Sequence, residues 1–277
     1  MTNLPDQIID FHVHLFPDRL FDAIWDYFGS VYQWNVIHKI YSDECIDYLQ
    51  QRDVSHIIYS NYSHKPGVAK TLNQWNENLL DRYPSLYCFA AYHPDDRDAL
   101  DYARSILKHP GVLGFKLQLL VQNFYPHDER VYPLYELMIE MDKRILFHVG
   151  TGPAGNDYVG YKYFEKMLKR YPDLPANVAH MGGFEYQEFM DLLGDHPNLT
   201  LDTSFSFYPE LEFRFNLDPG YLERYQDQIV YGSDFPNLIY PREEEIKTLL
   251  DYKFSADFYK KVFYENGRHI LQRHSSN

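Results

Sequence analysis

Cysteine is scarce in this chain of 277 residues, which contains only Cys45 and Cys88. Two cysteines are too few for a disulfide framework, and neither belongs to a Cys-x-x-Cys motif of the kind that binds zinc or performs redox chemistry. A disulfide-stapled secreted scaffold is therefore excluded. The composition instead favours a protein of the reducing cytoplasm.

Long apolar runs are also missing from the sequence. No stretch approaches the roughly 20 apolar residues that a membrane-spanning helix requires. Residues 1–7 lack the basic segment and the apolar run with which a signal peptide begins. Membrane insertion and secretion are both disfavoured, and a cytoplasmic location is expected.

Positive charge is in short supply, because 26 Lys and Arg residues face 40 Asp and Glu residues, a formal net charge of -14. A protein that binds nucleic acid needs Lys and Arg to replace the counterions of the phosphate backbone. The acidic balance therefore argues against a nucleic-acid partner. Net charge does not describe a single pocket, however, and a few local cations can still hold a small anionic molecule.

Apolar and aromatic residues, by contrast, are abundant. Hydrophobic residues make up 45% of the chain and aromatic residues 17%, with 26 Tyr and 19 Phe. This is enough apolar surface for a large core, and α/β barrels of about 250 residues fold as one unit. We therefore expect a single domain that spans residues 1–277.

Short β-rich segments alternate with longer segments of helical character, which is typical of parallel βα units. Strands are predicted at 8–14, 56–61, 87–92, 112–117, 145–150, 177–181, 199–203 and 229–234. Helices are predicted at 42–52, 68–83, 97–109, 131–142, 161–171 and 186–194, with a further amphipathic helix at 255–272. Eight strands favour the α/β fold of a closed (β/α)8 TIM barrel, and an open doubly wound sheet is the alternative.

The first predicted strand carries the most informative motif, His12-Val13-His14. Alternate side chains of a strand share one face, so both imidazoles point the same way while Ile9, Phe11 and Val13 point the other. Neutral imidazole is the commonest metal ligand, and two histidines in this spacing can bind one ion. Taken alone, the pair is equally consistent with an ordinary polar strand end.

Three other strand ends also carry titratable residues. His148 and His180 come at the ends of the fifth and sixth predicted strands, and Asp234 ends the eighth. In barrel enzymes the active site lies at the carboxyl ends of the strands. Taken singly, any one of these residues can be a structural polar group whose hydrogen bonds are satisfied. Together with the first strand, however, four strands carry titratable residues at the same edge of the sheet.

With these residues in view, the sequence resembles the amidohydrolase-related, metal-dependent TIM-barrel hydrolases of the amidohydrolase superfamily. The resemblance rests on the H-x-H motif, on histidines after strands five and six, and on Asp234 in a Gly-Ser-Asp-x-Pro context. It extends to residues 266–271, which are similar to the segment that closes many members. These motifs are specific for the superfamily and weak for the substrate.

The resemblance implies that His12, His14, His148 and Asp234 are metal ligands and that His180 is a catalytic or second-metal histidine. The expected cofactor is a divalent metal, with Zn²⁺ favoured, which lowers the pKa of bound water from about 15.7 toward about 7. Asp234 is suited to accept a proton from that water and to pass it to a leaving group. His180 can polarise the carbonyl oxygen of the substrate or anchor the nucleophile.

Lys116 lies at the end of the fourth predicted strand, where binuclear members of the superfamily carry a carboxylated lysine that bridges two metals. One interpretation is therefore a site that holds two metal ions, bridged by Lys116. The others are an unmodified cation that grips a substrate carboxylate, or an amine that neutralises nearby acids. In this branch a single metal is the commoner arrangement, so one ion and an unmodified Lys116 are favoured.

Substrate contacts are expected from the loops that follow the strands. Residues 16–39 form a long insertion rich in aromatic side chains, which is a candidate lid or pocket wall, although such clusters more often belong to a core. Arg242 is the first candidate for binding an anionic group of a small-molecule substrate. Weaker candidates for that role are Arg214, Lys162 and Tyr208.

The leading prediction is an enzyme, a hydrolase that cleaves a lactone, a cyclic amide or a related C–O or C–N bond of a small molecule through metal-activated water. The alternative is a lyase, since the same family contains nonoxidative decarboxylases and a hydratase with a similar metal site. A metal-dependent nuclease is less favoured, because related DNases usually carry Glu after strand four. A purely binding protein is the last alternative. A homodimer is compatible with this class of barrel, although no sequence feature locates an interface.

Overall fold

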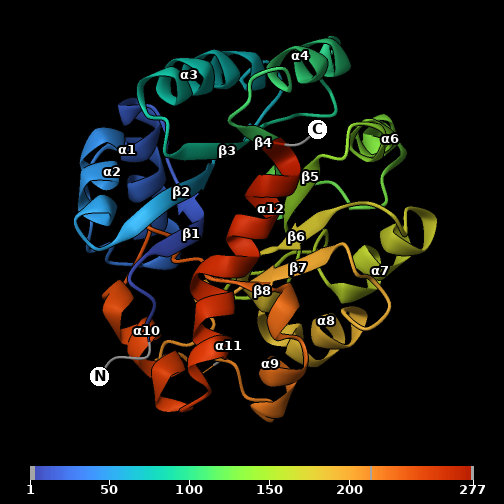
Figure 1. Ribbon diagram of the computed structural model, residues 1–277. Coiled ribbons are helices and arrows are strands. Elements are labelled where there is room, and N and C mark those ends of the chain that lie inside the picture. Colours follow the sequence, from blue (N-terminus) through green and yellow to red (C-terminus); the bar gives the residue numbers. More distant parts are fainter. Residues whose placement is uncertain (1–3, 213, 276–277) are drawn as a thin grey trace.

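The computed structural model describes residues 4–212 and 214–275, and its strands form one eight-stranded sheet in the order β1 to β8 (Figure 1). All neighbouring strands that pair are parallel. The strands are β1 (Ile8–His14), β2 (Val54–Ser60), β3 (Leu86–Ala91), β4 (Val112–Gln118), β5 (Arg144–His148), β6 (Ala176–Val178), β7 (Leu199–Asp202) and β8 (Ile229–Val230). Each lies at a predicted position.

The sheet closes between its first and last strands through backbone hydrogen bonds. The amide of Phe11 donates to the carbonyl of Tyr231 at 2.8 Å, and the amide of His14 donates to that of Phe235 at 2.7 Å. The amide of Asp234 donates in return to the carbonyl of His12 at 2.8 Å. The predicted (β/α)8 barrel is therefore confirmed, and the open sheet is excluded. The same bonds hold the H-x-H motif beside Asp234.

Helices surround the strands as an outer layer (Figure 1). The main ones are α1 (Asp18–Tyr27), α2 (Ser42–Gln50), α3 (Ala69–Arg82), α4 (Ala99–Ile106), α6 (Tyr132–Glu140), α7 (Tyr161–Arg170), α8 (Tyr186–Leu192), α10 (Arg242–Asp251) and α12 (Asn266–Ser275). Shorter helical segments are η1 (Phe28–Tyr32), α5 (Leu119–Gln122), η2 (Glu129–Val131), η3 (Ala179–Glu185), α9 (Gly220–Arg224), η4 (Gln226–Gln228), α11 (Ala256–Lys260) and η5 (Lys261–Glu265).

Two segments differ from their predictions. The insertion at 16–39, expected before the first regular helix, itself contains α1 and the π-helical turn η1. The predicted helix at 255–272 is divided, because the π-helical turn η5 separates α11 from α12. A π turn inserts one residue and rotates the following residues about the helix axis, so α12 presents a new face to the barrel.

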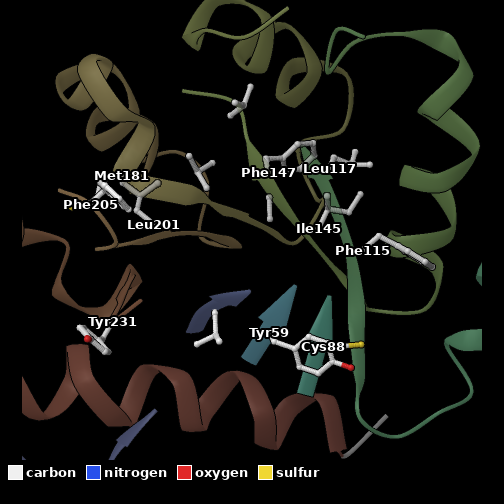
Figure 2. Close-up of a cluster of buried hydrophobic side chains, with 14 of the residues drawn as sticks. Tyr59, Cys88, Phe115, Leu117, Ile145, Phe147, Met181, Leu201, Phe205 and Tyr231 are labelled. Carbon is white, nitrogen blue, oxygen red and sulfur yellow. The ribbon is translucent and has the colours of Figure 1, made fainter. Parts of the chain in front are cut away.

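Buried hydrophobic side chains form two clusters. The larger one lies between strands and helices, and Figure 2 shows Phe115 and Leu117 of β4 beside Ile145 and Phe147 of β5. The smaller one takes its members from inside the ring, namely Ile9, Phe11, Ile58, Phe89, Leu113, Leu146, Ala179, Val230 and Leu271. Because Leu271 belongs to α12, that helix closes one end of the barrel, across which it lies in Figure 1.

The first strand corrects one expectation about side-chain direction. Ile9 and Phe11 belong to the inner cluster, whereas Val13 belongs to the outer one, so the three do not share a face as predicted. The cause is a shift in the β1–β2 register between Asp10 and Val13. A bulge of this kind moves the following side chains to the other face. His12 can therefore point inward although Phe11 does so too.

The described residues contain no helix that is both long and apolar enough to cross a membrane.

Candidate metal centre

His12, His14 and Asp234 meet at one end of the barrel. Nε2 of His12 lies 3.3 Å from Oδ1 of Asp234, and Nε2 of His14 lies 3.1 Å from the same oxygen. The three residues are buried, with at most 9% of their surface exposed. Two imidazole nitrogens and one carboxylate oxygen thus converge, which is a donor set that divalent cations bind.

His180 and His148 extend this group. The ring centroid of His180 lies 5.2 Å from that of His12 and 4.8 Å from that of His148. Within the described part of the chain, His12, His180 and Asp234 place their ligand atoms all within 4.8 Å of one another. The structure therefore gathers all five predicted residues, and it brings His180 close to His12 and Asp234 as well.

Asp234 and His180 lie just beyond regular strands, which end earlier than predicted. β6 stops at Val178 and β8 at Val230. His180 has a φ of 56° and Asp234 a φ of 64°, and these left-handed conformations end the extended backbone. Non-glycine residues rarely adopt such angles, and when they do they often belong to functional sites.

The turns that carry His148 and His180 touch through glycines. A Cβ atom at Gly150 would lie 2.2 Å from the carbonyl oxygen of Gly182, and one at Gly183 would lie 2.5 Å from the amide nitrogen of Gly152. Real Cβ atoms do not approach backbone this closely, so side chains at these positions would push the two turns apart. The close approach of His148 to His180 depends on these glycines.

The Gly150→Ala variant is expected to lose both stability and turnover, because the two histidine turns must separate to admit the methyl group. Overpacking of this kind costs about 1–3 kcal/mol. Thermal denaturation and a turnover assay measure the two effects. Gly29→Ala is the matched control, since a Cβ there would meet nothing within 4 Å. Equal melting temperatures for the two variants would contradict the packing argument.

Asp202, at the end of β7, is a buried residue that the sequence reasoning missed. Its Oδ2 accepts a hydrogen bond from Nδ1 of His12 at 2.9 Å, and its Oδ1 accepts from the amides of His180 at 3.1 Å and Ser204 at 3.2 Å. Burial opposes ionisation, but His12 and the other hydrogen-bond donors hold the pKa of Asp202 below its ordinary value. An ionised Asp202 thus orients two of the gathered histidines. The available signal was an acid at the end of the seventh strand.

Asp202→Asn is expected to weaken metal binding about 10–100-fold, the usual effect of removing a partner of a metal-ligating histidine. Both carboxylate oxygens accept hydrogen bonds, so either orientation of an amide places an NH2 group against another donor. Competition with a chelator measures the affinity. Asp195→Asn on the exposed surface is the control. Unchanged metal affinity in the Asp202 variant would contradict the orienting role.

The other histidines also turn Nε2 toward the centre. Nδ1 of His14 donates to the carbonyl of Ser60 at 3.3 Å, and Nδ1 of His180 donates to the carbonyl of Ser204 at 3.1 Å. A carbonyl oxygen can only accept, so Nδ1 carries the proton and Nε2 keeps its lone pair. Burial lowers the pKa of His180, and it lowers that of His12 to about 4, so both rings are neutral at pH 7.

His148 provides the observation that tests the fit of a cation. Its Nε2 is buried and has no hydrogen-bond partner, and neither has Oε1 of Gln118, whose Nε2 lies 3.2 Å from Nδ1 of His148. Exchanging the amide oxygen and nitrogen of Gln118 lets that oxygen accept from Nδ1–H of His148. The buried Nε2 of His148 then keeps a lone pair that has no binding partner. Together with the neutral histidines and Asp234, it fits a divalent metal ion.

Lys116 reaches the same place from β4. The side chain is fully buried, and Nζ lies 3.5 Å from Nε2 of His12. Burial lowers the pKa of Lys116 to about 8, although Asp202 and Asp234 favour its charged form. Its amine lies inside the histidine group rather than in the wall of the cavity described next.

A cavity of about 590 Å³ adjoins the centre. His14, His148, His180 and Asp234 form part of its wall. The remaining lining residues are Phe16, Leu20, Ala23, Ile24, Tyr27, Phe28, Tyr32, Trp34, Tyr62, His64, Gln118, Leu120, Val121, Asn123, Pro153, Ala154, Phe205 and Asn237. The predicted aromatic insertion is thus a wall of this cavity.

The residues predicted to hold an anionic group lie elsewhere. Arg242 is buried near Asp10, and its Nε lies 3.8 Å from Oε1 of Glu243. Arg214, Lys162 and Tyr208 are also absent from the lining of the cavity. Substrate binding by Arg242 stays a prediction without support from its position. The positive charge of Arg242 instead acts on the carboxylate of Asp10. Oδ1 of Asp10 accepts hydrogen bonds from the amides of His12 and Ser233.

Comparison with known proteins gives one family match. The sequence matches the family model described as Amidohydrolase over residues 9–273. No curated protein matches the chain.

Solved structures with the same fold are numerous but distant in sequence. An uncharacterised TIM-barrel protein from Bordetella bronchiseptica has a TM-score of 0.76 at 17% identity, with 98% of this chain and 100% of that chain covered. A 5-carboxyvanillate decarboxylase from Novosphingobium aromaticivorans, complexed with manganese, has a TM-score of 0.71 at 14% identity, with 96% of each chain covered. A probable 2-pyrone-4,6-dicarboxylic acid hydrolase from Acinetobacter baumannii has a TM-score of 0.65 at 16% identity, with 96% and 99% covered. At these identities the likeness shows the fold.

Proposed function

Because this chain belongs to the amidohydrolase family, we propose that it is a metal-dependent hydrolase acting on a lactone, a cyclic amide or a related bond of a small molecule. The observation that carries the proposal is the convergence of His12 and His14 on Oδ1 of Asp234 beside a cavity of substrate size. Pockets for small ligands have volumes of about 300–1,000 Å³. We also propose that residues 1–277 act as one domain, since the strands form one sheet.

We propose His12, His14, His148 and Asp234 as the ligands of one divalent ion, with Zn²⁺ favoured by the nitrogen-rich donor set. Such an ion lowers the pKa of water to about 7 and so supplies hydroxide at neutral pH. Lys116 remains an unmodified amine in this proposal. Its charge, where present, offsets the negative charge of Asp202 and Asp234.

Asp234 is the proposed general base and acid. Its carboxylate lines the cavity, so it can take a proton from a water molecule there and return it to the leaving group. His180 has the complementary role of a hydrogen-bond acceptor. Nδ1–H of His180 donates a hydrogen bond to the carbonyl of Ser204, so Nε2 of the neutral ring carries no proton. Nε2 can therefore accept a hydrogen bond from the attacking water, but it cannot donate one to a substrate carbonyl. Of the two roles predicted for His180, anchoring the nucleophile is therefore the one we propose.

The second candidate function is a nonoxidative decarboxylase or hydratase of a carboxylated small molecule. The aromatic lining of the cavity favours it, because ring walls suit a planar substrate. Decarboxylation needs an acid that protonates a carbon atom of the substrate, whereas hydrolysis needs a base that takes a proton from water. Asp234 can serve in either role. The fold likeness to a 5-carboxyvanillate decarboxylase is compatible with this reading.

The deciding experiment compares lactones and cyclic amides with carboxylated aromatics, before and after treatment with a chelator. The hydrolase proposal expects a product that has gained one water molecule, and activity that returns when Zn²⁺ is restored. Release of CO2 from a carboxylated aromatic would replace the first proposal by the second. Turnover that is unaffected by metal removal would contradict both.

A further inference from the structure

A second cavity, of about 190 Å³, lies at the other end of the barrel from the metal centre. Arg144 lines it and begins β5, whereas His148 ends the same strand at the metal centre. The rest of the lining comes from neighbouring strands, from the loops before them and from α12, the helix that lies across this end in Figure 1. Pockets for drug-sized ligands have volumes of about 300–1,000 Å³, so this smaller cavity suits a small ion.

Arg144 is held in place by hydrogen bonds to neutral oxygens. Its Nε donates to Oδ1 of Asn177 at 2.6 Å. Its Nη2 donates to the carbonyls of Ala176 at 2.9 Å and Asn198 at 3.0 Å, and to Oγ1 of Thr200 at 3.0 Å. Among the residues that the structure describes, no carboxylate forms an ion pair with this guanidinium. Its orientation is therefore fixed, while its charge is not neutralised by a neighbouring acid.

The other charges of the lining are already paired. Both carboxylate oxygens of Asp142 accept hydrogen bonds from Arg273 of α12 at 2.7 Å, and Asp227 pairs with Lys261 at 3.0 Å. Burial and the positive charge of Arg273 lower the pKa of Arg144 to about 10, so its guanidinium stays charged at pH 7. A cation removed from water normally has an anionic partner. Within the described chain Arg144 lacks one, although the net charge of the sequence is -14.

Two hydrogen-bond donors accompany this charge. Nη1 of Arg144 donates to none of the described residues, whereas the other two nitrogens of the guanidinium do donate. The side chain of Thr200, which is only 7% exposed, also lines the cavity. Because its oxygen accepts from Arg144 and a hydroxyl carries one proton, the Thr200 proton is left to donate. N–H and O–H donors beside an arginine charge are groups that bind phosphate and similar oxyanions.

We infer that this cavity binds a small oxyanion with the size and charge of inorganic phosphate, and that Arg144 and Thr200 are its main ligands. The inference concerns the end of the barrel away from the metal centre and does not depend on the proposed function. A bound anion connects β5 and β7 to Arg273 of α12. The amino-terminal face of a barrel serves stability rather than catalysis, so stabilisation of the fold is the expected effect of the anion.

Phosphate binding can be measured without any substrate. The purified protein is titrated calorimetrically with sodium phosphate at pH 7, with sodium chloride at equal ionic strength as the reference. At about ten times its Kd, phosphate is expected to raise Tm by at least about 2 °C, whereas chloride is not. An absence of phosphate binding, or an equal effect of chloride, would overturn the inference.

Arg144→Gln removes the charge that lacks a partner and is expected to weaken phosphate binding at least about tenfold. Arg104→Gln is the matched control, because Arg104 belongs to an exposed ion pair with Glu140 at 3.7 Å, outside the cavity. Phosphate that binds the Arg144 variant with native affinity would lie elsewhere, for example at the metal centre. That result would contradict the inference.

A second pair of variants keeps the test decisive if the loss of Arg144 prevents folding. Arg273→Gln and Asp142→Asn break the same surface ion pair from its two sides, so their shared effect on stability is expected to be small. Arg273→Gln removes a positive charge from the lining and is expected to weaken phosphate binding about threefold or more. Asp142→Asn removes a negative charge and is expected to tighten it by a similar factor. Equal affinities of the two variants would contradict an anion site at this cavity.

Discussion

Replacing both His12 and His14 with alanine is expected to remove the bound metal and to reduce turnover at least about 10³-fold, since even the loss of an outer-shell partner costs about 10–100-fold. The two imidazoles supply the nitrogens nearest to Oδ1 of Asp234, at 3.3 and 3.1 Å. Without them the proposed ion keeps His148 and Asp234 alone. Elemental analysis of the purified variant and a turnover assay measure the two losses.

The control for this pair is His56→Ala, which removes a half-buried histidine from β2, outside the centre. It is expected to keep both metal and turnover, so it separates the loss of ligands from the general effect of removing imidazole. Near-native circular dichroism of the double variant shows that the barrel is intact. Stoichiometric, tightly bound metal in the folded double variant would refute the assignment of the centre.

Asp234→Asn is expected to lower kcat by about 10²–10⁴-fold, the range of a general acid–base residue. The amide keeps the size of the carboxylate but cannot take a proton from water. It also removes the negative charge next to His12 and His14, so metal affinity is expected to fall as well. Assays at saturating Zn²⁺ separate the two effects, because any kcat loss that remains there belongs to proton transfer.

A suitable control is Asp227→Asn, which removes an exposed carboxylate that pairs with Lys261 at 3.0 Å. Exposed ion pairs contribute about 0–1 kcal/mol, so folding and turnover should be nearly unchanged. Full kcat of the Asp234 variant at saturating metal would rule out the proposed base and leave Asp234 as a ligand at most.

The position of the centre could be predicted because parallel strands bring their carboxyl ends to one edge. Residues as distant in sequence as His12, His148 and Asp234 therefore meet without any local contact between them. Asp202 escaped this reasoning although it obeys the same rule. Its role appears only when Nδ1 of His12 is found 2.9 Å away.

The bulge in β1 and the turn at His180 could not be predicted in the same way. Alternation of side chains assumes regular backbone, and the shift between Asp10 and Val13 breaks that assumption. The positive φ angles at His180 and Met181 depend on tertiary contacts, since non-glycine residues adopt such angles only uncommonly. Arg242 was likewise predicted from its type and position to bind an anionic substrate group, yet it is buried beside Asp10.

The backbone hydrogen bonds between β1 and the segment around Asp234 affect the order in which the barrel assembles during synthesis. His12 leaves the ribosome well before Asp234 and before α12, the helix that closes one end of the barrel. Until then the inward faces of the early strands stay exposed, and partly made chains with exposed apolar surface aggregate readily. The nascent chain therefore cannot assemble the proposed metal site until the segment around Asp234 has emerged.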